Sequence, residues 1–184
     1  MLEGKNVNLR VVEKEDLPLL AEWQNDPNFY AEYFSPMPIS RTELEKRFDK
    51  ATSETTPFES RNFIIEKKDG TKIGNIVHFY SLHPMGRMLE MGYVMLPSER
   101  KKGYCTEAAK IMVDYLFLSK DTPCIQAITD VGNTASQKVL ENVGFKREGT
   151  LRKRFFSRGR WVDAVFFSIL REEWKEPKIL TKVT

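Results

Sequence analysis

The sequence has few of the residues that build disulfide frameworks and zinc sites. Its 184 residues include two cysteines, Cys105 and Cys124, and two histidines, His78 and His83. Two cysteines make no disulfide framework, and no Cys/His cluster has the spacing of a zinc site. We therefore expect no metal site and a protein of a reducing compartment, the cytoplasm.

Long apolar runs, internal repeats and low-complexity tracts are missing as well. No run of 18 or more apolar residues occurs, so we expect no membrane span. The stretch MLEGKNVNLRVVEKEDL has no basic start followed by an apolar segment, so we expect no signal peptide. With 41% hydrophobic and 30% charged residues, the chain suits a single globular domain over residues 1–184. A net charge of +3 permits an anionic partner but does not require nucleic acid.

The residues that are present show the periods of strands and helices. Apolar alternation and turn signals predict strands over about 6–12, 61–68, 71–80, 86–96, 124–130, 145–156 and 161–170. Helical periodicity predicts a helix that Asp16 and Pro18 open, and further helices over about 41–51, 105–118 and 133–143. The strand–helix–strand unit in the middle of the chain should join two neighbouring parallel strands. We predict an α+β fold: a mixed, mostly antiparallel sheet of about seven strands with a central βαβ crossover and about four helices.

A basic turn inside this crossover is the first functional signal. In PSERKKGYCTEAAK, Arg100, Lys101 and Lys102 precede Gly103 at the start of a helix. Cations there oppose the helix dipole by about 0.3–1 kcal/mol each, whereas free N–H groups and the dipole together bind anions. Gly103 lets the backbone approach a ligand, and Thr106 can cap the helix or donate to an oxygen. The turn is either a phosphate cradle or a solvated basic loop, and it lacks the Walker and three-glycine dinucleotide patterns.

In order along the chain, these segments resemble the GNAT superfamily of acetyl-CoA-dependent N-acetyltransferases. That family carries Arg/Gln-x-x-Gly-x-Gly/Ala after its fourth strand, where this chain reads RKKGYC. The segments E-x-GY, GYxTEA and N-x-x-S…LE-x-x-GF are most similar to ribosomal-protein N-terminal acetyltransferases of the RimJ/RimL type. The likeness runs from the first strand to about Trp174. Cys105 replaces the usual glycine or alanine; it is either tolerated as a small residue or a nucleophile at a helix N-terminus.

The resemblance implies that acetyl-CoA is the donor and that no metal takes part. The diphosphate of coenzyme A would bind backbone N–H groups at the basic turn, and the pantetheine arm would pair with the end of the preceding strand. The residues that the resemblance implies for cofactor binding are Met95, Leu96, Arg100, Lys101, Lys102, Gly103, Tyr104, Cys105, Thr106, Asn133 and Ser136.

Two catalytic roles follow from the chemistry of acetyl transfer. The amine must be neutral to attack the thioester, and the leaving thiolate needs a proton. Glu90 lies inside an apolar strand, so it is the candidate base unless it faces solvent or pairs with a cation. Many family members use a tyrosine as the acid where this chain has Leu140, and the RimJ/RimL pattern offers Ser136 instead. Asn133 would hold the arm or an ordered water, cap its helix, or do both.

The acceptor amine is expected against the first two helices, the 30–40 loop and the last hairpin. The aromatic residues of this region line a groove if they are exposed and belong to the core if they are buried: Trp23, Phe29, Tyr30, Tyr33 and Phe34. The hairpin cations form a solvated face or a surface for an acidic substrate, ribosome or nucleotide sugar: Lys146, Arg147, Arg152, Lys153, Arg154, Arg158 and Arg160. Asp163 meets the substrate ammonium or pairs with an arginine.

We therefore expect an enzyme that transfers acetyl from acetyl-CoA to a primary amine by direct attack. The acceptor is a protein N-terminus or a small-molecule amine. The alternatives are an RNA- or ribosome-binding protein on the same fold and a non-catalytic acetyl-CoA sensor. We expect no membrane partner, no nucleic acid except through the ribosome, and a monomer or homodimer.

Overall fold

The computed structural model describes residues 1–30, 33–35, 38–53, 60–83 and 86–180. Within them, eight strands form one sheet in the order β1-β2-β3-β4-β5-β6-β8-β7. The strands are β1 Leu2–Glu3, β2 Val7–Val11, β3 Arg61–Lys67, β4 Lys72–His83, β5 Gly86–Met95, β6 Cys124–Asp130, β7 Lys146–Ser157 and β8 Arg160–Leu170. The helices are α1 Leu17–Asn25, α2 Arg41–Ser53, α3 Tyr104–Ser119 and α4 Thr134–Val143, with short 3-10 turns at η1 Lys14–Asp16 and η2 Pro97–Glu99.

The predicted α+β fold is confirmed, with one strand more than the seven expected. Strand β1 pairs with β2 through Leu2↔Leu9 and Glu3↔Asn8. Two residues are too few to show a period in the sequence. The central crossover from β5 through α3 to β6 is parallel, and the other neighbouring strands are antiparallel.

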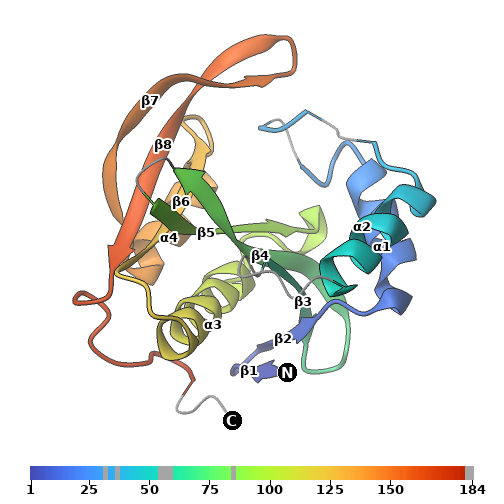
Figure 1. Ribbon diagram of the computed structural model, residues 1–184, viewed down its shortest axis with the longest axis horizontal. Helices are drawn as coiled ribbons and strands as arrows, with labels where there is room; N and C mark the ends of the chain where they lie inside the picture. Colours follow the sequence, from blue (N-terminus) through green and yellow to red (C-terminus); the bar gives the residue numbers. More distant parts are fainter. Residues whose placement is uncertain (31–32, 36–37, 54–59, 84–85, 181–184) are drawn as a thin grey trace.

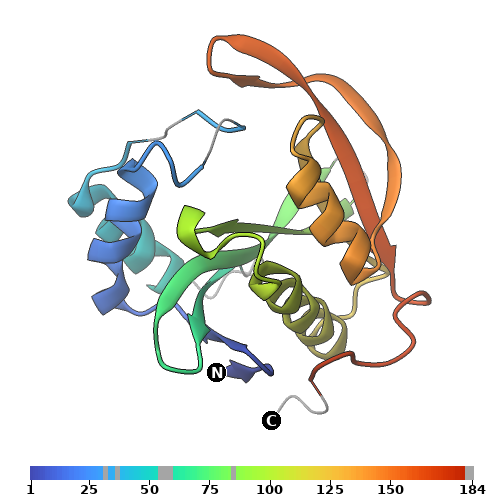
Figure 2. The same ribbon diagram turned by 180° about the vertical axis from the view of Figure 1, so that it is seen from behind.

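Helices cover both faces of the sheet (Figures 1 and 2). Along β3, Phe63 and Ile65 belong to the core that contains α3 and α4, whereas Ile64 belongs to the core that contains α1. This alternation is the period of a strand that is buried on both sides. The sheet is therefore the middle layer, with α1 and α2 on one face and α3 and α4 on the other.

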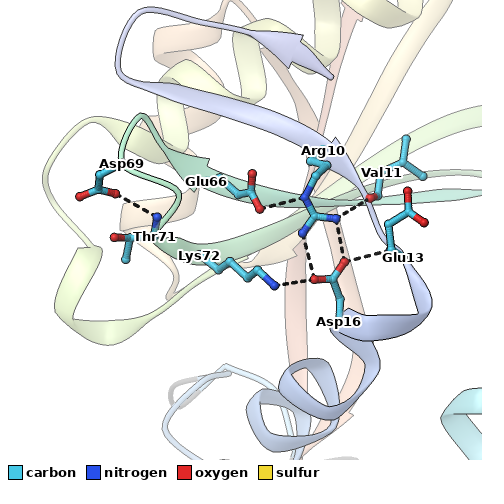
Figure 3. A network of polar contacts seen from close by, with 8 residues as sticks. All are labelled: Arg10, Val11, Glu13, Asp16, Glu66, Asp69, Thr71 and Lys72. Atoms are coloured by element: carbon cyan, nitrogen blue, oxygen red, sulfur yellow. Dashed lines mark hydrogen bonds and ion pairs between the residues drawn. The ribbon is translucent and has the colours of Figure 1, made fainter.

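A buried carboxylate fixes α1 to the sheet (Figure 3). Asp16 is 1% exposed, and its oxygens accept two hydrogen bonds of 2.9 Å from Arg10, one of 2.7 Å from Lys72 and one of 2.9 Å from the Glu13 N–H. Arg10 also donates to Glu66 at 2.9 Å. Burial alone would raise the pKa of Asp16, but the hydrogen bonds from Arg10 and Lys72 hold it well below its usual range. We call these residues the Asp16 cluster.

The sheet opens in its middle, between β5 and β6. The two strands pair only through Leu89↔Ile125 and Glu90↔Gln126, whereas β4 and β5 pair without a register shift from His83↔Gly86 to Gly74↔Met95. In the described part of the sheet, the β5 segment after Glu90 therefore has a strand neighbour on its β4 side alone. This gap lies beside the end of β5, the strand with which the resemblance implies that the pantetheine arm pairs.

Candidate active site

Four contacts enclose the place where β5 and β6 separate, and we call them the site frame. The hairpin of β7 and β8 reaches over this place toward the segment after α1 (Figures 1 and 2). The contacts are Arg100 Nη2 to Phe29 O at 2.8 Å, Ser157 Oγ to Tyr33 O at 3.1 Å, Val131 N to Asp163 O at 3.0 Å, and Tyr93 Oη to Ser136 Oγ at 3.1 Å. The frame thus joins the basic turn, the α1 side, the last hairpin and α4.

The basic turn presents free backbone donors. Lys101 and Gly103 both have left-handed backbones, with φ of 62° and 84°, so the chain coils tightly before α3. The helical hydrogen bonds of α3 begin with Glu107 N–H to Gly103 O at 3.1 Å. The N–H groups of residues 104–106 therefore have no acceptor within the helix. A Cβ placed on Gly103 would meet no atom within 4 Å, so the space beside the Gly103 Cα is open.

The charges around this turn are only partly neutralised. Glu99 accepts hydrogen bonds from Lys67 and Lys102, each at 3.1 Å. The bonds from Lys102 and Lys67 hold the pKa of the Glu99 carboxyl below its usual range. Lys101 makes no hydrogen bond or ion pair with any described residue and is exposed. The turn therefore keeps a net positive charge for an anion.

Arg100 has a different placement from the one we predicted. Its guanidinium donates to Met95 O at 3.1 Å, to Asn28 O at 3.2 Å and to Phe29 O at 2.8 Å. Burial lowers the pKa of this side chain, and an arginine remains charged at neutral pH. The side chain thus ties the turn to the α1 side instead of adding charge to the cradle.

The end of β5 refines the prediction for Met95 and Leu96. Leu96 N–H donates to Ile73 O at 2.9 Å, and Leu96 O accepts from Glu99 N–H at 2.9 Å. Both backbone groups of Leu96 are therefore used inside the protein. Backbone donors alternate in direction along an antiparallel pair, so the N–H groups of Met91, Tyr93 and Met95 point into the gap beside β6.

Ser136 and Asn133 meet at the start of α4, as their spacing predicted. Asn133 Oδ1 accepts from Ser136 N–H at 3.0 Å, so Asn133 is the helix N-cap. Its amide nitrogen stays available to a ligand, because the cap uses only the oxygen. The Tyr93 hydroxyl donates to Ser136 O at 3.1 Å, and its Oη also lies 3.1 Å from Ser136 Oγ, where either hydroxyl can be the donor. Sequence reasoning used Tyr93 only as part of the E-x-GY pattern and gave it no role.

Glu90 lies where the pairing of β5 with β6 ends. Its neighbours across the sheet are Phe79 of β4 and Gln126 of β6. Two-residue alternation places Glu90 on the same face as Val94, which packs against the core beside α1. Glu90 is half-buried and forms no ion pair with a described residue. It thus has the setting of a candidate base on the acceptor side.

Cys105 does not have the properties of a nucleophile. Burial raises the pKa of its thiol to about 12, so the thiol is protonated at neutral pH. A neutral thiol is a poor nucleophile. Across the described ranges, no group of three or more His, Cys, Asp or Glu side chains could hold a metal ion.

The aromatic residues near α1 divide between core and surface. Trp23 and Phe29 are buried and stacked, with ring centroids 5.4 Å apart. Phe34 is 36% exposed, and its ring centroid is 6.1 Å from that of Phe155 on β7. The predicted 30–40 loop falls partly on residues 31–32 and 36–37, which lie outside the described residues.

The cations of the β7–β8 hairpin also divide into two sets. Near the base, Lys146 pairs with Glu173 and Arg147 donates to Thr150. Near the tip, Arg158 donates to Phe34 O and Pro27 O, each at 3.4 Å. Asp163 accepts from the backbone N–H of Lys153 at 2.8 Å; no bond to an arginine side chain is found for it in the described chain.

Comparison with known proteins gives one family. Residues 6–146 match the model of the acetyltransferase (GNAT) domain. The chain is 27% identical over 174 residues to spermidine N(1)-acetyltransferase of Escherichia coli K12, covering 95% of this chain and 91% of that protein. It is 26% identical over 182 residues to the putative ribosomal N-acetyltransferase YdaF of Bacillus subtilis 168, covering 95% and 97%. A crystal structure of Vibrio cholerae spermidine N-acetyltransferase with CoA and spermine superimposes with a TM-score of 0.81 at 25% identity, covering 93% and 99%.

Among the described residues, no helix is both long enough and apolar enough to cross a bilayer.

Proposed function

We propose roles for the residues of the site frame from the premise that the chain belongs to the GNAT acetyltransferase family. As a member, it is an enzyme that transfers an acetyl group from acetyl-CoA to an amine. The observation that carries the proposal is the open backbone edge of β5, directly beside a basic turn with free N–H groups. The two features match the two polar parts of coenzyme A, its pantetheine amides and its diphosphate.

Coenzyme A would bind along this edge from the turn inward. The diphosphate would accept hydrogen bonds from the N–H groups of residues 101–106, with the ammonium groups of Lys101 and Lys102 beside it. The pantetheine amides would pair with Tyr93 and Met95 as an added strand does. As in our sequence prediction, we propose that Met95 pairs with the pantetheine amides. We no longer propose this for Leu96, because its backbone N–H and C=O are bonded within the protein.

The acetyl carbon would then lie near the point where β5 and β6 separate. Glu90, directly or through a water, would take the proton from the ammonium form of the acceptor. The neutral amine would attack the thioester carbon, and a β5 N–H would stabilise the oxyanion. When the carbon–sulfur bond breaks, the Ser136 hydroxyl would donate its proton to the leaving thiolate. The attacking nitrogen loses its second proton as the amide forms, and this proton replaces the one on Ser136 through solvent, while Glu90 releases the first proton to solvent.

Tyr93 would orient the Ser136 hydroxyl in this step. Burial raises the pKa of Tyr93, so its hydroxyl stays protonated, and its one proton can turn from Ser136 O to Ser136 Oγ, each 3.1 Å away. Ser136 can then direct its own proton toward the sulfur. Tyr93 acts through Ser136 and is a positioning residue.

We also propose a subfamily, an acceptor class and a cellular compartment for this enzyme. The E-x-GY and N-x-x-S patterns and the likeness to YdaF support a RimJ/RimL-like enzyme. The acceptor would be a peptide N-terminus or a small-molecule amine. Both cysteines are free, which supports a reducing compartment such as the cytoplasm.

A thiol-release assay tests this function. Purified protein with acetyl-CoA is offered a library of amines that includes N-terminal peptides, amino sugars and polyamines. Release of free coenzyme A that depends on one amine class supports the proposal. Stabilisation by acetyl-CoA without release would favour the sensor. Salt-dependent RNA binding without any effect of acetyl-CoA would favour the RNA-binding protein.

A further inference from the structure

The tip of the β7–β8 hairpin concentrates positive charge without acids. The segment RKRFFSRGR, residues 152–160, holds five cations and no anion. Arg152, Lys153, Arg154 and Arg160 are exposed, and their side chains form no ion pair with any residue in the described ranges. Most surface cations lie among acids that offset them. This hairpin tip is different, because the four exposed cations just named have no acidic partner among the described residues.

The position of this charge is fixed on both sides. At one end, Asp163 O accepts from Val131 N–H at 3.0 Å, and Asp163 Oδ1 accepts from Lys153 N–H at 2.8 Å. Val131 precedes the N-cap Asn133 by two residues. At the other end, the Arg158 N–H donates to Ser35 Oγ at 2.8 Å. The charged hairpin therefore spans from the start of α4 to the segment after α1.

The contacts of this hairpin with Val131, Tyr33 and Ser35 place it between the start of α4, which holds Ser136, and the segment after α1. A polyamine carries several positive charges and would be repelled by the hairpin cations. An amine with a carboxylate or phosphate a few bonds away would be attracted, because like charges repel and opposite charges attract over roughly one Debye length, about 8 Å at physiological salt. Spermidine, the acceptor named for two of the relatives described above, is therefore the natural comparison for an anionic acceptor.

We infer that the acceptor of this enzyme carries negative charge close to its amino group, and that the cations of residues 152–160 select it. This inference rests on the proposed function and specifies its acceptor. The class includes peptide N-termini followed by acidic residues and amino sugars that bear a phosphate. Arg154 and Arg160 are the residues through which the selection can be changed, because neither has a partner whose loss would disturb the fold.

The experiment compares matched acceptors in the thiol-release assay. Peptides share one N-terminal residue and carry acidic, neutral or basic residues at the next three positions, and spermidine is measured beside them. We expect kcat/KM to be about tenfold higher for the acidic than for the basic peptide at low salt, with the ratio falling as salt screens the charges. Arg154→Glu/Arg160→Glu should invert the order.

A variant with the same charge change elsewhere is the control. Lys175→Glu/Lys178→Glu alters two cations of the segment that follows β8 in the sequence, and should leave the ratio unchanged. Figure 1 shows that this segment runs toward the C-terminus, away from the hairpin tip. Equal rates for all peptides, preference for spermidine, or an equal response to both double variants would overturn the inference and leave the acetyltransferase standing. Failure of every amine to release thiol would instead count against the proposed function.

Discussion

The Asp16 cluster and the site frame differ in whether their polar groups have hydrogen-bond partners within the protein. In the Asp16 cluster, a buried carboxylate receives four hydrogen bonds, and both of its cations approach within 2.9 Å. Around the site frame, the N–H groups of residues 104–106 have no acceptor within their helix, the β5 segment after Glu90 has no strand neighbour on its β6 side, and Arg152, Lys153, Arg154 and Arg160 form no ion pair with a described residue. Groups that are satisfied internally stabilise one fold, and groups that are left open can bind a ligand. Mutations in the two regions should therefore change different quantities.

Loss of the Asp16 charge should give the largest effect, and on stability alone. Asp16→Asn leaves Arg10 and Lys72 without their shared anion, which costs about 3 kcal/mol of unfolding free energy. Urea denaturation measures this loss. Asp69→Asn, at the exposed turn in Figure 3, is the matched control and should cost far less. Equal losses from both changes would mean that the cluster has no special role.

The Asp16 carboxylate should also make the stability of the fold decrease at acidic pH. The folded-state pKa of Asp16 lies below its unfolded value of about 3.9. Its stabilisation is therefore fully present above about pH 4 and is lost as the pH falls through the folded-state value. Thermal unfolding between pH 6 and pH 2 should show a steeper decline for the wild type than for Asp16→Asn. Parallel curves for the two proteins would contradict the assignment.

Changes at Ser136 should affect turnover and leave stability nearly unaltered. Ser136→Ala should lower kcat by about a hundredfold, the scale of one lost proton donor, with little change in the KM for acetyl-CoA. Tyr93→Phe should lower kcat less. The double variant should be no slower than Ser136→Ala, because Tyr93 acts only through that hydroxyl. Independent, multiplying losses would show that Tyr93 has another role, and an unchanged rate in Ser136→Ala would remove it from the mechanism.

Arg100 combines a property of the Asp16 cluster with a place in the site frame. It is satisfied internally like Asp16, yet it belongs to the site frame. Arg100→Ala should lower kcat/KM for the acceptor about tenfold, the factor for about 1.4 kcal/mol of lost positioning. Arg100→Lys should not restore it, because one ammonium cannot reproduce the planar fork that reaches three carbonyls. Lys101→Ala should instead weaken cofactor binding alone; if both variants act alike, Arg100 belongs to the cradle as first predicted.

The sequence alone predicted the elements of the fold, because they depend on local patterns, whereas the site that it indicates stays a prediction. Alternation placed the strands, and the basic turn before Gly103 predicted an anion site. It missed β1, which two residues cannot signal. It also misplaced the Arg100 side chain and overlooked the Tyr93–Ser136 contact. Those depend on which segments meet in space, 71 and 43 residues apart in the chain, and no local period encodes such contacts.

Two glycines allow the most direct test of the central claim, that the basic turn binds the diphosphate of coenzyme A. Gly103 and Gly70 both have φ of 84°, and a Cβ on either meets no atom within 4 Å. Glutamate therefore costs similar backbone strain at both positions, but only at Gly103 does it place a carboxylate in the cradle. Calorimetric titration with coenzyme A should show wild-type affinity for Gly70→Glu and no measurable binding for Gly103→Glu. Equal binding by the two variants would contradict the account.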